Sequence, residues 1–268
     1  MKIIFLIGLA FVLAVGGLRF VSRKLLYFPV SLDRARQQQL ESLGPAVKEL
    51  TLQIKDKGCL KGWILEKDME NLPVIFYFGG NAEEVSLNIE DYLAQVDANI
   101  VLVNYRGYGQ SAGRPREADL KSDALALFDS VAREHGLTPD RCGAWGRSLG
   151  SSIASYLVWK KNLKGLILTC PFDSIEAVAA GVYPAWLVNL VLTDSHRTLD
   201  FSGQIRADTL ILAAARDEII PLARTEAMYD SLKAPKELVM VQGTGHNTIS
   251  ESREYYPVIN LFLKKIFP

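Results

Sequence analysis

The sequence predicts an α/β fold in which helices cover both faces of a mostly parallel, twisted sheet. Short apolar runs alternate along the chain with longer stretches of helical periodicity. Strands of a parallel sheet show such uninterrupted apolar runs because helices bury both of their faces. A length of 268 residues suits one α/β domain. A Gly-x-Ser-x-Gly pattern at residues 146–150, between a strand-like run and a helical stretch, fits the same architecture.

The expected elements begin at residue 47. The first two strands are expected to be antiparallel, because Lys55–Gly58 reads as a turn in which Gly58 is free to take a positive φ. The expected strands are Val47–Ile54, Cys59–Leu65, Pro73–Phe78, Asn99–Asn104, Cys142–Trp145, Lys164–Thr169, Thr209–Ala214 and Leu238–Gln242. The expected helices are Glu83–Gln95, Glu117–His135, Ser148–Lys161, Leu222–Leu232 and Glu251–Phe267.

An uncharged apolar run, Ile3–Leu18, precedes these elements. A membrane span needs about 20 apolar residues, and the run approaches this length if Arg19 extends to the membrane surface. A cleaved signal peptide is the alternative, since Ala14–Gly16 is an acceptable cleavage site. We favour a retained membrane anchor, because the run is slightly long for a signal peptide and several positive charges follow it.

The chain therefore divides into an N-terminal membrane anchor or signal segment at residues 1–24 and one α/β domain at residues 25–268. Ser31–Leu43 is expected to be a polar connector. Positive charges lie on both sides of the apolar run, with a slight excess after it, which favours a cytoplasmic domain only weakly. The side of the membrane stays open, and cleavage would give a secreted or periplasmic protein.

One connection in the domain is unusually long. Almost 40 residues separate the strand that ends near Cys170 from the strand that starts near Thr209. Its middle, Val182–Leu192, is strongly apolar. It is interpreted either as an ordinary covering helix or as a short lid at residues 174–203, and both can hold, because α/β enzymes place specificity in such insertions.

The composition excludes several classes of function. The net charge is zero, the pI is 6.8, and no basic stripe stands out, so we expect no nucleic-acid partner. The three cysteines, Cys59, Cys142 and Cys170, provide no disulfide framework. No clustered His/Cys spacing suggests a metal site, and no cofactor is expected. The oligomeric state stays open.

The pattern at residues 146–150 predicts a nucleophile at Ser148. Gly146 and Gly150 let the backbone turn sharply, and the turn holds the serine hydroxyl at the end of a strand. A serine nucleophile needs a base that takes its proton and an acid that orients the base.

The chain has three histidines that could serve as this base. His135 lies at the end of an expected helix, where a histidine commonly interacts with terminal carbonyls. His196 lies in a polar segment of the expected lid, and we expect it on the surface. His246 follows the last strand in a Gly-rich loop, from which it can reach a neighbouring strand end. The expected base is therefore His246.

The acid is expected after an intermediate strand. Asp217 follows the strand at Thr209–Ala214 and is the best candidate, whereas the adjacent Glu218 is expected to point elsewhere. An oxyanion hole is also needed, because charge develops on the former carbonyl oxygen. One donor is expected to be the N–H of Leu149, and the other the N–H of Asn81. The glycines before Asn81, Gly79 and Gly80, permit close backbone approach; an ordinary strand-to-helix turn is the alternative.

Several motifs in succession resemble the α/β-hydrolase superfamily, and more narrowly the bud-emergence-46-like and alpha/beta-hydrolase-domain group. The resemblance runs from about Leu25 to the C-terminus. The motifs are L-L-Y-F-P at 25–29, F-G-G-N-A at 78–82, N-Y-R-G-Y-G-Q-S-A-G at 104–113, G-R-S-L-G at 146–150, C-P-F-D-S-I at 170–175, R-D-E-I-I-P at 216–221 and G-T-G-H-N at 243–247.

The resemblance implies a triad of Ser148, Asp217 and His246, in the chain order of α/β-hydrolases. It also implies that Arg106 and Tyr108 lie in a turn near the active site and support it. The chain departs from the family pattern where Gly79-Gly80 replaces the usual His-Gly and where Ala214 replaces a frequent Gly.

We therefore expect a serine hydrolase that cleaves a carboxylic ester or thioester through an acyl-enzyme. A lipid-like acyl substrate is a hypothesis motivated by the anchor and by the apolar segment near Trp186; a small-molecule ester is the other candidate. A serine peptidase of the same fold is the nearest alternative. A non-enzymatic membrane adaptor is the second, although an adaptor has no need of all three triad groups.

Overall fold

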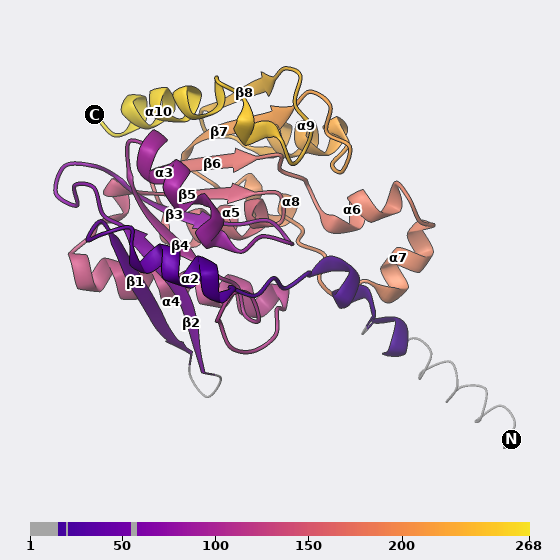
Figure 1. The fold of residues 1–268 in the computed structure, drawn as a ribbon. Coiled ribbons are helices and arrows are strands. Elements are labelled where there is room, and N and C mark those ends of the chain that lie inside the picture. The colour runs from indigo at the N-terminus through magenta and orange to yellow at the C-terminus, as the bar shows by residue number, and fades with distance from the viewer. Residues whose placement is uncertain (1–15, 20, 55–57) are drawn as a thin grey trace, which may run out of the picture.

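The computed structural model describes residues 16–19, 21–54 and 58–268 (Figure 1). Most of the predicted membrane anchor, and residues 55–57 of the predicted turn, lie outside the described residues. Residues 16–19 and 21–26 are helical. Within the described ranges, no helix is both long enough and apolar enough to cross a membrane.

In the described part of the chain, one eight-stranded sheet has the order β1-β2-β4-β3-β5-β6-β7-β8. β1 and β2 are antiparallel, as are β2 and β4, and every later pair is parallel. The mostly parallel sheet predicted from the sequence is confirmed. The strands are Val47–Ile54 (β1), Gly58–Leu65 (β2), Val74–Phe78 (β3), Asn99–Val103 (β4), Cys142–Arg147 (β5), Gly165–Thr169 (β6), Asp208–Ala214 (β7) and Lys236–Val241 (β8).

Helices cover both faces of the sheet (Figure 1). Successive side chains of a strand point to opposite faces. Phe76 of β3 therefore joins one apolar core with α4 and α5, whereas Tyr77 joins the other core with α3 and α10. The helices are Arg34–Glu41 (α2), Ile89–Gln95 (α3), Glu117–His135 (α4), Gly150–Lys161 (α5), Ile175–Ala180 (α6), Ala185–Val191 (α7), Leu199–Ser202 (α8), Leu222–Ser231 (α9) and Tyr255–Ile266 (α10), and 3-10 turns span Val85–Asn88 (η1), Pro139–Arg141 (η2) and Ile249–Glu251 (η3).

Some helices differ from the sequence prediction at their N-termini. α5 begins at Gly150 instead of Ser148, because Ser148 has a φ of +50°, which no α-helix accommodates. The stretch expected to be one helix from Glu83 begins with the 3-10 turn η1 before α3. The expected connector at Ser31–Leu43 contains a helix, α2, whose N-cap Asp33 accepts a hydrogen bond from the Arg36 N–H at 2.7 Å.

The long connection at residues 174–203 contains three short helices, α6, α7 and α8. α6 and α7 stand at one end of the sheet, close to the N-terminal helix (Figure 1). The expectation that His196 lies on the surface is wrong. His196 is fully buried, its ring Nε2 lies 2.9 Å from the Tyr27 hydroxyl, and its backbone N–H donates to Glu117 Oε2 at 2.9 Å. Packing of the N-terminal segment against this connection covers the histidine.

Candidate active site

The candidate nucleophile lies on a tight turn at the carboxyl end of β5. The Ser148 backbone N–H donates to the Thr169 carbonyl of β6 at 2.8 Å, and its φ of +50° is uncommon for a residue other than glycine. A Cβ on Gly146 would collide with the Gly150 carbonyl, and a Cβ on Gly150 would collide with the Phe78 carbonyl. Both glycines are thus required for the turn to pack between β3 and α5.

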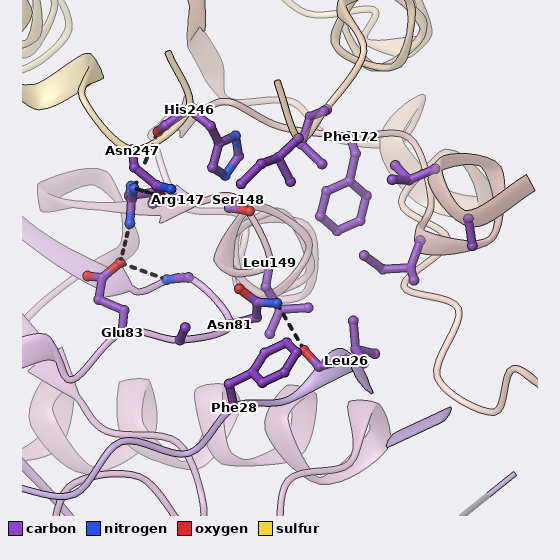
Figure 2. A pocket seen from close by; sticks show the side chains of 17 residues that line it. Leu26, Phe28, Asn81, Glu83, Arg147, Ser148, Leu149, Phe172, His246 and Asn247 are labelled. Atoms are coloured by element: carbon purple, nitrogen blue, oxygen red, sulfur yellow. Dashed lines mark hydrogen bonds and ion pairs between the residues drawn. The ribbon is translucent and has the colours of Figure 1, made fainter. Parts of the chain in front are cut away.

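A histidine–carboxylate pair stands beside this turn, on loops that follow β8 and β7. The Nδ1 atom of His246 lies 2.8 Å from Asp217 Oδ2 and 3.0 Å from Asp217 Oδ1. With Nδ1 directed at the carboxylate, the remaining nitrogen, Nε2, is available to a neighbour. The His246 ring and the Ser148 hydroxyl face the same pocket (Figure 2).

The acid of this pair is held in its charged form. Burial alone would raise the pKa of Asp217, but the hydrogen bond from His246 and the backbone N–H groups of Ile220 and Ile219 outweigh burial and lower it. Those two N–H groups donate to Asp217 Oδ1 at 2.7 and 3.0 Å. Glu218 does not point away from the site as expected, because its carboxylate accepts a hydrogen bond from the His246 backbone N–H at 3.0 Å.

The loop after β3 brings Asn81 to the opposite side of Ser148. The Asn81 carbonyl accepts hydrogen bonds from the Tyr108 hydroxyl at 2.6 Å and from the Phe28 N–H at 2.9 Å. The Asn81 side-chain amide donates to the Leu26 carbonyl at 3.1 Å (Figure 2). Within the described chain, neither the Asn81 N–H nor the Leu149 N–H donates to a protein acceptor, so neither group is used in a hydrogen bond inside the protein.

These groups surround a pocket of about 460 Å³, a volume typical of small-molecule sites. Ser148, His246, Asn81 and Leu149 are among the residues that line it. The rest of the lining is mostly apolar, and its members come from the N-terminal segment, the loop after β6, α6 and the loop after β7: Leu26, Phe28, Phe172, Ile175, Val178, Ala179, Ile219 and Ile220.

No family model matches the chain, but curated proteins do. This chain is 28% identical over 247 residues to an uncharacterized protein of Mycobacterium tuberculosis, and the alignment covers 90% of this chain and 87% of that protein. It is 27% identical to alpha/beta hydrolase domain-containing protein WAV2 of Arabidopsis thaliana, covering 91% and 88% of the two chains. It is 23% identical to protein bem46 of Schizosaccharomyces pombe, covering 96% and 90%.

Solved structures with a similar fold also include α/β-hydrolases. An alpha-beta hydrolase from Vibrio vulnificus has a TM-score of 0.71 at 18% identity, covering 92% of this chain and 91% of that chain. The chain has the α/β-hydrolase fold. The esterase Pf2001 of Pyrococcus furiosus also has a similar fold, with a TM-score of 0.69 at 16% identity, covering 91% of this chain and 98% of that chain.

The two residues expected to support the site, Arg106 and Tyr108, occupy different places. Tyr108 contacts the Asn81 carbonyl directly. Arg106 is buried at a distance from the pocket lining and makes a bidentate ion pair with Asp123 of α4, with both contacts at 2.6 Å. The Asp123 carboxylate raises the pKa of Arg106 against the effect of burial. Arg106 thus fastens the turn at 104–113 to α4, whereas Tyr108 reaches the site.

An ion pair that was not predicted from the sequence joins the loops of this site. Arg147, the second residue of the G-R-S-L-G motif, pairs with Glu83 Oε2 at 3.0 Å and donates to the His246 carbonyl at 3.3 Å and to Asn247 Oδ1 at 3.0 Å. Glu83 Oε2 also accepts from the Gly80 N–H at 2.8 Å. The only sequence signal was an arginine inside the motif and a glutamate near the end of another strand.

The Glu83 carboxylate also fills the space beside Gly79. A Cβ on Gly79 would lie 2.9 Å from that carboxylate, so the Gly79-Gly80 pair that departs from the family pattern makes room for Glu83. Gly80 has ordinary space, and its contribution is the N–H that donates to Glu83.

One cysteine also belongs to the surroundings of the histidine–carboxylate pair. Ligand atoms of Cys170, Asp217 and His246 lie within 4.8 Å of one another. Burial, followed by the Asp217 charge, raises the pKa of the Cys170 thiol to about 12. The thiol is therefore protonated at neutral pH, whereas a metal ligand needs the thiolate.

Proposed function

We propose that this α/β-hydrolase is a serine hydrolase that cleaves carboxylic esters or thioesters through an acyl-enzyme. The observation that carries the proposal is the meeting of Ser148, the His246–Asp217 pair and two available backbone N–H groups at one apolar pocket. A nucleophile, an oriented base and an oxyanion site are the three parts that acyl transfer requires.

The proposed mechanism assigns one task to each group. His246 Nε2 takes the Ser148 proton as the hydroxyl oxygen attacks the acyl carbon. Asp217 keeps the proton on Nδ1 and stabilises the imidazolium, while the Asn81 and Leu149 N–H groups donate to the oxyanion. The imidazolium then protonates the leaving alcohol or thiol. In the second half, His246 activates a water molecule that attacks the acyl-enzyme and releases the acid.

The apolar lining supports an acyl group of hydrocarbon character as the substrate portion. A peptide amine would need a carboxylate at the pocket as its binding partner. The Glu83 carboxylate does not favour this role, because it is already paired with Arg147 at 3.0 Å. We therefore rank ester or thioester cleavage above peptide cleavage. A lipid-like acyl chain is part of the proposal, together with the catalytic domain at residues 25–268, a lid at 174–203 and an anchor at 1–24 that would hold the enzyme at a membrane.

A series of p-nitrophenyl esters and acyl thioesters of increasing chain length tests the proposal, with matched peptide amides as the competing class. We expect turnover of esters or thioesters that Ser148→Ala abolishes, with kcat/KM rising from short to medium or long chains. Cleavage of peptides only would replace the ester proposal. Far faster cleavage of the shortest soluble esters would remove the lipid-like substrate. A biological effect that persists in Ser148→Ala would favour the adaptor.

A further inference from the structure

The L-L-Y-F-P segment at residues 25–29 has no part in the triad, yet it lies against the active site. Its middle residues, Leu26 to Phe28, connect the N-terminal helix to the rest of the domain, and Leu26 and Phe28 line the pocket (Figure 2). We call these three residues the arm. Its two sides contact two different structures, the loop that carries Asn81 and the connection at residues 174–203.

On one side, the arm holds the loop of the candidate oxyanion donor. The Phe28 N–H donates to the Asn81 carbonyl at 2.9 Å, and the Asn81 side chain donates to the Leu26 carbonyl at 3.1 Å. The Tyr108 hydroxyl completes the group, because it donates to the Asn81 carbonyl at 2.6 Å and accepts from the Phe28 N–H at 3.1 Å. Asn81 is thus fixed at its carbonyl and its side chain, whereas its N–H makes no hydrogen bond within the described chain.

The side chains of the arm form part of the pocket wall. Leu26 and Phe28 line the pocket together with Phe172 and the side chains of α6. Figure 2 shows the Phe28 ring and the Leu26 side chain close to Asn81, facing the same space as Ser148. A hydrocarbon chain in the pocket would therefore contact the segment that also holds the oxyanion loop.

On its other side, the arm is fastened to the predicted lid. The Tyr27 side chain is buried, and its hydroxyl lies 2.9 Å from His196 Nε2. One turn earlier, Arg23 pairs with Asp194 at 3.0 Å, and Ser22 donates to the Val191 carbonyl at 3.1 Å. The position of the arm is thus set jointly by the lid segment and by the oxyanion loop.

We propose that the arm is a positioning element of the active site, which holds the Asn81 oxyanion donor and selects the acyl chain through Leu26 and Phe28. This inference rests on the proposed serine hydrolase function. It predicts two separable effects. Loosening the contacts to Asn81 lowers kcat for every substrate, because transition-state stabilisation is lost. Truncating the Leu26 or Phe28 side chain raises KM for long acyl chains only, because short chains do not reach these side chains.

Two variants separate these effects. Tyr108→Phe removes the hydroxyl that fixes the Asn81 carbonyl, and we expect kcat to fall roughly tenfold at all chain lengths with KM little changed; full loss of one oxyanion donor costs about 10²- to 10³-fold. Phe28→Ala removes a half-exposed ring, so folding is not at risk, and we expect a several-fold higher KM for long chains that Phe28→Leu restores. Leu261→Ala, on the exposed face of α10, is the matched control with no change.

The outcomes distinguish this inference from the proposed function. An active wild type whose Tyr108→Phe and Phe28→Ala variants, with wild-type unfolding midpoints, keep its kcat and its chain-length profile overturns the inference alone. A folded wild type that hydrolyses no acyl substrate overturns the proposed function and the inference with it. The predicted split between kcat and KM supports the inference, because a purely structural role would lower the amount of folded enzyme without changing the chain-length profile.

Discussion

Replacing the buried His196 by asparagine should make the stability of the protein less sensitive to acid. Burial lowers the pKa of the His196 imidazole from 6.5 to about 4. The Glu117 and Asp194 carboxylates oppose this effect, and the Lys121 ammonium adds to it. Asparagine suits the position because His196 has a φ of +46°, a conformation that asparagine tolerates better than most residues.

The magnitude follows from the linkage between protonation and folding. The unfolded chain takes up the proton near pH 6.5, whereas the folded chain resists it until about pH 4. The stabilisation from the neutral, buried ring is therefore complete above pH 6.5 and is lost as the pH falls toward 4. At about 1.4 kcal/mol for each pH unit, this loss amounts to about 3 kcal/mol.

Urea unfolding between pH 8 and pH 4.5 measures this effect, and the comparison concerns the change in the free energy of unfolding with pH. We expect the wild type to lose about 2 to 3 kcal/mol more than His196→Asn over this range. Tyr27→Phe removes the hydrogen bond between the Tyr27 hydroxyl and His196 but keeps the imidazole. This variant should therefore follow the wild-type pH dependence. Equal pH dependence in the wild type and His196→Asn would refute the assignment of a depressed pKa to this ring.

Three further predictions concern the site. Gly150→Ala places a methyl group against the backbone at the end of β3 and should destabilise the protein by about 3 kcal/mol in thermal or urea unfolding; an unchanged midpoint would contradict the close approach. Arg147→Met removes the ion-pair partner of the largely buried Glu83 carboxylate and should cost about 2 kcal/mol, and the double variant with Glu83→Gln should recover part of this loss in a double-mutant cycle. Asp217→Asn removes the carboxylate that orients His246 and should lower kcat about 10⁴-fold with little change in KM; retention of near-wild-type kcat would exclude Asp217 as the orienting acid.

The strands were predictable to within one or two residues because their signal is local. Val47–Ile54 was predicted with its observed bounds, and β3 and β4 each differ by one residue at one end. Continuous apolar runs between glycines, prolines and polar residues leave few other interpretations. The meeting of Ser148, Asp217 and His246 was also predictable, because residues that follow parallel strands gather at the carboxyl edge of the sheet.

Features that depend on contacts between distant segments were not predictable. α2 was taken for a connector because its own residues are polar; ion pairing of Arg36 with Glu90 of α3, at 2.5 Å, ties it to the domain. His196 was placed on the surface because its neighbours in the sequence are polar, whereas Tyr27, far away in the chain, covers it.

The Glu83–Arg147 pair was missed for the same reason. Each residue follows or ends a different strand, and only the sheet order, with β3 beside β5, brings them together. The arm is the clearest case of this kind. Its motif was recognised in the sequence, but its contact with Asn81 became evident only from the fold.

Labelling with a fluorophosphonate probe tests the central proposal most directly, since the probe reacts only with an activated serine. The wild type and Ser148→Ala would be labelled side by side, and mass spectrometry would locate the modified peptide. We predict one adduct, at Ser148, that is absent from the alanine variant. A folded wild type that stays unlabelled, or an adduct elsewhere that persists in Ser148→Ala, would contradict the proposal that His246 and Asp217 activate Ser148 for acyl transfer.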